Sequence, residues 1–101
     1  MLGELETAVM EILWAHPEAG MTVRDVHERL SVRRDLAYTT VMTVLDRLSK
    51  KEIVHRELEG RAWLYRPSRT RVELVSDEIH ELLGWLSPAE RAEVLTRFDR
   101  N

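Results

Sequence analysis

The sequence predicts a mainly α-helical protein with one small β-hairpin, and three observations lead to this fold class. Apolar residues recur at helical spacing through the first half of the 101-residue chain. After Lys51 the apolar period changes from about 3.6 residues to about 2, and it keeps that value up to Pro67. Helical spacing then returns. We therefore expect three helices, a hairpin and two further helices.

The first two helices are expected over residues 4–16 and from Thr22 onward. Trp14 lies off the apolar stripe of the first helix, and we expect it to pack on a later element, because a large exposed indole is unusual. Thr22-Val-Arg-Asp25 is a weak capping box that begins the second helix. The residues expected to face the core are Leu5, Ala8, Val9, Ile12, Leu13, Val23, Val26 and Leu30.

The third helix is expected over Asp35–Lys51, with Asp35 as its N-cap. Its apolar stripe is Val41, Val44, Leu45 and Leu48. The other face carries small hydroxyls near its start and cations near its end. Threonine can offer a hydroxyl and a methyl group to base edges in the major groove, which is typical of a recognition helix. An ordinary solvent-exposed helix face remains the alternative.

A hairpin follows this helix directly, with strands at Ile53–Leu58 and Arg61–Arg66 and a turn at Glu59-Gly60. Two short helices, a third hydroxyl-faced helix and a hairpin together define a winged helix-turn-helix. Arg61, beside the turn, is either a phosphate contact or a solvated cation. Trp63 and Tyr65 share one strand face, and we expect both in the core.

Two amphipathic helices are expected at the C-terminus, over residues 70–84 and from the Ser87-Pro-Ala-Glu90 capping box to about Phe98. Because the winged helix already has a core, we expect them to cover a partner chain. The alternative is that they fold back on the first helix and cover Trp14. The predicted dimerisation residues are Val72, Val75, Ile79, Leu82, Leu83, Leu95 and Phe98.

The expected domains are therefore a winged-helix DNA-binding domain over residues 1–67 and a C-terminal helical dimerisation region over 68–101. The net charge of −3 conceals an uneven distribution. Residues 22–66 contain ten Lys and Arg against seven Asp and Glu, whereas the flanking segments are acidic. Positive charge is thus concentrated around the candidate recognition helix, as expected of a nucleic-acid contact surface.

Several other function classes find no support in the sequence. There is no cysteine, no Gly-rich phosphate loop and no G-x-S-x-G or H-E-x-x-H motif, so we expect neither an enzyme nor a cofactor. The four histidines fall on different expected elements without metal-ligand spacing, which argues against a metal site. The N-terminus resembles neither a signal peptide nor a membrane anchor, so we expect a cytoplasmic protein that does not associate with membranes.

Several separated motifs, in order, resemble the penicillinase repressor family of BlaI and MecI, to which the CopY repressors also belong. The motifs are Leu2–Glu6, Val9–Trp14, Thr22–His27, Ala37–Leu48, Lys50-Lys51, Gly60–Ala62 and Tyr65–Pro67. The resemblance implies a dimeric winged-helix repressor that binds an inverted repeat with TACA/TGTA-type arms in promoter DNA. It also implies that C-terminal helices form the dimer.

When the family's DNA-contacting residues are carried over one by one, the resemblance implies base contacts in the first half of the third helix. It implies phosphate contacts at the end of that helix and in the hairpin. With the N-terminus of the second helix, which can bind a phosphate through its N–H groups, the expected DNA-binding residues are Thr22, Thr39, Thr40, Met42, Thr43, Arg47, Lys50, Lys51 and Arg61.

Three departures from the family pattern qualify this picture. Glu52 stands where the family often has glycine, so the end of the third helix is expected to differ slightly. The C-terminal region is shorter than in the resistance repressors, which implies a smaller dimer interface. The chain contains neither an Asn-Phe bond nor cysteines, which argues against induction by that cleavage and against copper sensing by thiolates. An upstream sensor-protease is therefore not identified.

The sequence is best interpreted as a homodimeric, sequence-specific repressor with double-stranded operator DNA as its partner. Two alternatives are a winged-helix module for protein–protein interaction and a ligand-responsive regulator. A protein-docking face should be more apolar than one carrying three threonines and a lysine pair. A ligand could lie near Trp14 and Trp85, although no pocket is visible in the sequence.

Overall fold

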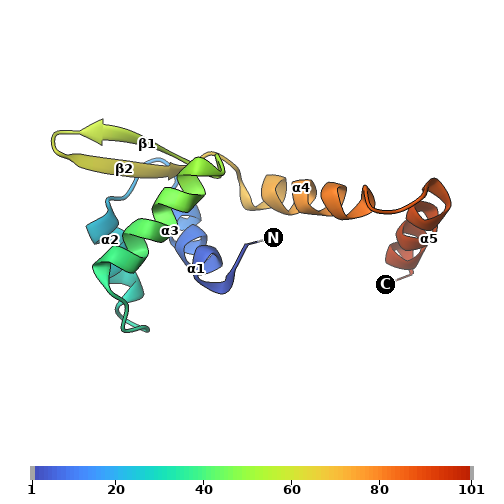
Figure 1. The fold of residues 1–101 in the computed structure, drawn as a ribbon, viewed down its shortest axis with the longest axis horizontal. Coiled ribbons are helices and arrows are strands. Elements are labelled where there is room, and N and C mark those ends of the chain that lie inside the picture. Colours follow the sequence, from blue (N-terminus) through green and yellow to red (C-terminus); the bar gives the residue numbers. More distant parts are fainter. Residues whose placement is uncertain (1, 101) are drawn as a thin grey trace. The chain divides into compact units, whose positions relative to one another are not determined.

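The computed structural model describes residues 2–100, which contain five helices and one two-stranded antiparallel sheet (Figure 1). This arrangement confirms the predicted fold class, a winged helix. The chain divides into two compact units, Met1–Arg71 and Val72–Asn101. The elements in order are α1 (Glu4–Ala15), α2 (Val23–Leu30), α3 (Tyr38–Lys50), β1 (Val54–Glu59), β2 (Ala62–Pro67), α4 (Arg71–Leu83) and α5 (Pro88–Asp99).

The first unit has a single apolar core to which all three of its complete helices and the base of the hairpin contribute. The apolar stripe predicted for α3 is fully buried there, since each of its four residues is at most 5% exposed. The core also contains Met10 and Met21, which the helical pattern did not single out. The buried residues are Val9, Met10, Leu13, Met21, Val26, Leu30, Val41, Val44, Leu45, Leu48, Val54 and Tyr65.

Backbone pairing ties the start of α2 to the hairpin. Met21 and Tyr65 exchange two hydrogen bonds, of 3.0 and 2.8 Å. Thr22 then caps α2: its hydroxyl accepts from the Asp25 N–H, and the Asp25 carboxylate accepts from the Thr22 N–H. The predicted capping box is therefore present. It fixes the N-terminus of α2 next to β2.

The third helix begins later than the sequence predicted, and Asp35 does not cap it. The N-cap is Ala37, which has no side-chain hydrogen bond to offer, and the first helical residue is Tyr38. Leu36, just before the cap, is partly buried against the core, and its carbonyl oxygen lies 2.7 Å from Nε2 of His27. Docking of Leu36 thus keeps the chain extended past Asp35, and tertiary packing outweighs the capping preference.

At the end of α3 a residue other than glycine takes the left-handed backbone conformation that glycine adopts most easily. Lys51 is the C-cap, and the next residue, Glu52, has a φ of 61° in the left-handed region. The N–H groups of Glu52 and Ile53 donate to the carbonyls of Ser49 and Leu48, at 3.0 Å each. These bonds satisfy the last helical carbonyls and turn the chain into β1.

The hairpin pairs Val54 with Pro67 at its base and Glu59 with Ala62 next to the turn. Gly60, in the turn, has a φ of 64°, which a glycine adopts without steric penalty. Tyr65 is buried as predicted, but the prediction was wrong for Trp63, which is 41% exposed. The difference arises because Trp63 pairs with Leu58 in the outer half of the hairpin, beyond the reach of the helical core.

The second unit consists of α4 after its first residue, together with α5. Ser87 and Glu90 form the predicted capping box at the start of α5, with Pro88 at its first position. Among the described residues, neither α4 nor α5 contains a buried one. No helix in this part of the chain has the length and apolar character that a membrane span requires.

Candidate nucleic-acid interface

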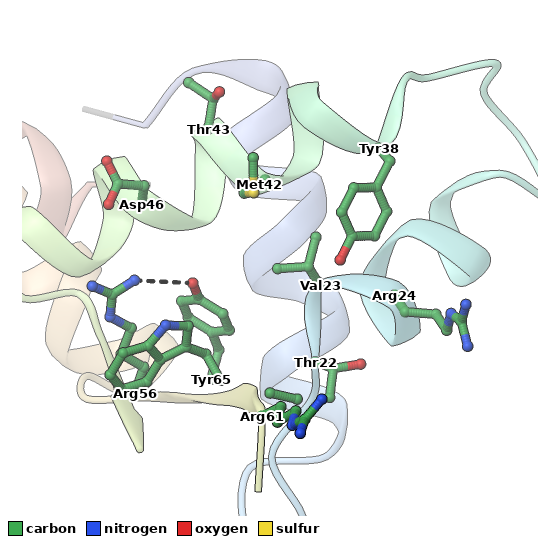
Figure 2. Close-up of a pocket in the computed structure, with 12 residues that line it drawn as sticks. Thr22, Val23, Arg24, Tyr38, Met42, Thr43, Asp46, Arg56, Arg61 and Tyr65 are labelled. Carbon is green, nitrogen blue, oxygen red and sulfur yellow. Dashed lines mark hydrogen bonds between the residues drawn. The ribbon is translucent and has the colours of Figure 1, made fainter. Parts of the chain in front are cut away.

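A groove of about 790 Å³ lies between the N-terminus of α2, the outer face of α3 and the hairpin (Figure 2). We call the hairpin β1–β2 the wing. The groove contains four of the nine predicted DNA-binding residues. Its lining residues are Thr22, Val23, Arg24, Tyr38, Met42, Thr43, Asp46, Arg56, Arg61, Ala62, Trp63 and Tyr65.

Helix α3 places Tyr38, Met42, Thr43 and Asp46 along the groove. Met42 is 44% exposed and Tyr38 is 47% exposed, so both present apolar surface to solvent. The Thr43 hydroxyl donates to the Thr39 carbonyl oxygen at 2.9 Å. That bond fixes the hydroxyl orientation, so Thr43 offers its methyl group and its oxygen lone pairs to a ligand.

The N-terminus of α2 forms a second wall. Its capping box satisfies the N–H groups of Thr22 and Asp25 within the chain. In an α-helix the first N–H groups have no intrahelical acceptor, so Val23 and Arg24 are the residues whose N–H groups can meet an anion here. The exposed guanidinium of Arg24 adds a positive charge at the same wall.

The wing contributes an ordered cation that the sequence reasoning missed. The guanidinium carbon of Arg56 lies 4.3 Å from the ring centroid of Trp63. An Arg56 Nη1–H group donates to the Tyr65 hydroxyl at 3.4 Å, as drawn in Figure 2. Stacking on an aromatic face and a hydrogen bond both restrict the side chain, so Arg56 is held in place at the groove. Arg61, near the wing turn, lines the same groove.

Strand alternation could have revealed this arrangement. Arg56 is paired with Tyr65 across the hairpin, and Leu58 with Trp63, so these side chains share one face with Val54. Tyr38 was missed for another reason, because the predicted helix began three residues earlier, at Asp35. The structure makes it the first helical residue, and its ring lies edge-on to His27 with centroids 5.8 Å apart.

Five predicted DNA-binding residues lie outside the groove lining: Thr39, Thr40, Arg47, Lys50 and Lys51. All five are at least partly exposed. The Lys50 ammonium pairs with Asp46 at 3.0 Å, one turn earlier on α3. The Lys51 ammonium pairs with Glu6 of α1, also at 3.0 Å. The last turn of α3 is therefore partly neutralised by carboxylates of the same unit.

Glu6 of α1 interacts with Gly3, Arg47 and Lys51, and its side chain is 15% exposed. Burial by itself raises the pKa of Glu6, but three favourable interactions outweigh it and lower the pKa below its usual value of 4.5. The carboxylate accepts from the Gly3 N–H at 3.1 Å and from Lys51, and it is attracted to Arg47. Glu6 therefore remains ionised and ties α1 to the end of α3.

No group of three or more His, Asp or Glu side chains within residues 2–100 is arranged to hold a metal ion. The chemistry of the groove is instead that of recognition, with apolar and hydroxyl groups on α3 flanked by arginines on α2 and the wing. Such a combination fits a ligand that presents both base edges and phosphates.

The sequence matches the penicillinase repressor family over residues 2–101. This chain is a member of the penicillinase repressor family. It is similar to the transcriptional regulator BlaI of Mycobacterium tuberculosis, with 59% identity over 75 residues that cover 74% of this chain and 54% of the relative. This penicillinase repressor family member thus spans about half the length of the curated relatives it matches first.

Solved structures of the family show the same fold. The DNA-binding domain of the repressor BlaI aligns with a TM-score of 0.64 at 27% identity, covering 72% of this chain and 87% of that one. The Bacillus licheniformis BlaI monomer in complex with the blaP half-operator aligns with a TM-score of 0.60, at the same identity and coverage.

Proposed function

We propose that this protein is a sequence-specific transcriptional repressor that binds an inverted-repeat operator as a homodimer. The groove between α3 and the wing carries the proposal, because it combines base-reading side chains with ordered cations on one face. The similarity to BlaI, which has been solved on its half-operator, supports the same conclusion. The lining also carries three arginines and Asp46, and such charged groups are depleted at the centre of protein–protein interfaces.

In this proposal α3 enters the major groove of DNA. Met42 and Thr43 contact base edges, and Thr39 and Thr40 lie at the N-terminal end of the same helix, where recognition helices reach bases. Tyr38 packs beside them on the sugar–phosphate backbone. The threonine and methionine side chains offer hydroxyl oxygens and methyl groups, which suit adenine and thymine edges.

Cations around the groove supply the sequence-independent part of the affinity. Arg24, Arg56 and Arg61 face the DNA backbone from α2 and the wing. Arg47 and Lys50 extend the positive surface along α3, and Lys50 can exchange its exposed pair with Asp46 for a phosphate at little cost. Lys51 contributes less, because Glu6 offsets its charge.

The second unit supplies the dimer contact in this proposal. Val72, Ile79, Leu82, Leu95 and Phe98 are between 41% and 74% exposed, although they are large apolar residues. Large exposed apolar side chains gathered on two neighbouring helices of the sequence are typical of a protein–protein interface. Two copies would place two recognition helices on half-sites about one helical turn, on the order of 34 Å, apart.

Fluorescence anisotropy tests the proposal. The purified protein is titrated against a labelled duplex carrying the TACA/TGTA-type inverted repeat, against the DNA upstream of its own gene and against a scrambled duplex. We expect saturation at two protomers per site and tighter binding to the inverted repeat or the upstream DNA than to the scramble at about 150 mM salt. Equal affinity for all three duplexes would contradict the proposal.

A further inference from the structure

The last residues of the winged-helix unit are attached to α1 through Trp14. The indole N–H of Trp14 donates to the Arg69 carbonyl oxygen at 2.8 Å. The guanidinium of Arg71 lies 5.0 Å from the centroid of the same ring. It also pairs with the Glu11 carboxylate at 3.2 Å. We call residues 67–71 the exit segment, because the second unit begins at Val72.

The beginning of the exit segment is attached independently. The Ser68 N–H donates to the Ile53 carbonyl oxygen at 2.9 Å, and the Ser68 hydroxyl lies 3.0 Å from Nδ1 of His55. The exit segment is therefore held on both sides, by β1 and by α1. A Pro-Ser-Arg-Thr sequence of this length would otherwise be a short flexible linker.

Trp14 is well suited to this attachment. Its ring packs against the core, so its position is set by the fold of the unit. An indole N–H in such a partly buried place requires an acceptor, which the Arg69 carbonyl provides. The Arg71–Glu11 pair alone would contribute little, because both side chains are more than half exposed. Together with the stacking of Arg71 on the ring, it fixes the last residue of the unit.

We propose that Trp14 and Arg71 are positioning residues that make simultaneous binding of two half-sites efficient. This inference rests on the proposed function as a dimeric repressor. When one half-site is bound, the second binds at an effective concentration that depends on the length and stiffness of the connection between the two DNA-binding units. Holding the exit segment on α1 shortens the free connection in each protomer and so raises that effective concentration.

The test compares a duplex carrying two TACA/TGTA-type arms with a duplex carrying one arm. Trp14→Phe keeps the ring but removes the N–H donor, and Arg71→Gln removes the cation. We expect the double variant, which removes both attachments, to lose about tenfold in affinity for the two-arm duplex, and each single variant to lose less. We expect a change of less than about twofold on the one-arm duplex, because none of the groove residues is altered.

Arg97→Gln is the matched control, since it removes an exposed arginine that pairs with Glu93 on its own helix. It should change neither affinity. Thermal unfolding of each variant checks that the winged helix remains folded. Equal losses on the two duplexes, or no loss on either, would overturn the inference. If the wild-type protein binds the one-arm and two-arm duplexes equally, the dimeric repressor itself is refuted, and the inference is refuted with it.

Discussion

Glu52 adopts a left-handed backbone conformation that is strained for any residue with a Cβ atom. At a φ of 61° the Cβ of any L-residue approaches the neighbouring carbonyl, which costs roughly 1–2 kcal/mol relative to a relaxed conformation. The turn is nevertheless kept, because it directs Ile53 and Val54 from the end of α3 into the core and β1. The packing of the following residues offsets the local strain.

Glu52→Gly should therefore stabilise the protein by about 1 kcal/mol, because glycine adopts this conformation without the steric penalty. Urea denaturation followed by circular dichroism measures the free energy of unfolding. Glu52→Ala is the matched control: it removes the same charge but retains a Cβ, so it should give little of the gain. Equal stabilisation by both variants would assign the effect to charge instead of conformation.

Glu6 provides a pH-dependent contribution. Its folded-state pKa is lowered, so the stability it provides is complete above its unfolded pKa, near 4.5. That stability is lost as the pH falls through the lower folded value. Glu6→Gln should therefore destabilise the protein at pH 7, and the difference from wild type should shrink toward pH 3. Denaturation at both pH values measures this.

Glu28→Gln, which removes an exposed carboxylate on α2, is the charge-matched control for Glu6→Gln. A difference between wild type and Glu6→Gln that stays constant from pH 7 to pH 3 would contradict the role assigned to the Glu6 carboxylate.

At the scale of elements, the sequence predicted every helix and both strands, because apolar periodicity follows directly from burial on one face. The ends of the helices and the burial of individual side chains were harder to predict from the sequence. Asp35 is a better N-cap than Ala37 by local preference, but docking of Leu36 decides where α3 begins. Trp63 is a large apolar residue of the kind expected in a core. Its pairing with Leu58 in the outer half of the hairpin nevertheless places it beyond the core.

The candidate site, too, was predicted only in part. Periodicity identified the exposed face of α3, including Met42 and Thr43, because that face is the complement of the buried stripe. Arg56 and Arg24 were missed, because their proximity to α3 depends on how the wing and α2 pack. The pairing of Lys51, a predicted DNA contact, with Glu6 was also missed, because the two residues are distant in sequence.

The wing and the end of α3 can be compared directly. Arg56→Ala should weaken binding to specific and random duplexes alike and lower the slope of log affinity against log salt by about one unit, as expected for a lost phosphate contact. Lys51→Ala should lower the slope less, because Glu6 offsets its charge. Anisotropy titrations at several salt concentrations measure both slopes. If Lys51→Ala lowered the slope more than Arg56→Ala did, Lys51 and not Arg56 would be the stronger phosphate contact.

At the scale of the whole molecule, the two units differ in how they bury apolar residues and in their charge. The winged-helix unit has a complete apolar core and concentrates the cations. The second unit, in its described residues, has no fully buried residue on either helix. A pair of short helices without a core is marginal in water, so their stability depends on covering the apolar face. A second copy of the same chain is the partner that we propose.

Leu82→Asp should accordingly give monomers. Leu82 is 50% exposed in the single chain, and a carboxylate placed in an apolar contact loses its hydration without a partner, which costs several kcal/mol. Sedimentation equilibrium measures the change in association. His80→Asp is the matched control, because it places the same charge on another face of α4, and it should leave the dimer intact. The monomeric variant should still bind a one-arm duplex, since the groove of the first unit is unaltered. A Leu82→Asp protein that remains dimeric would place the interface elsewhere on the chain.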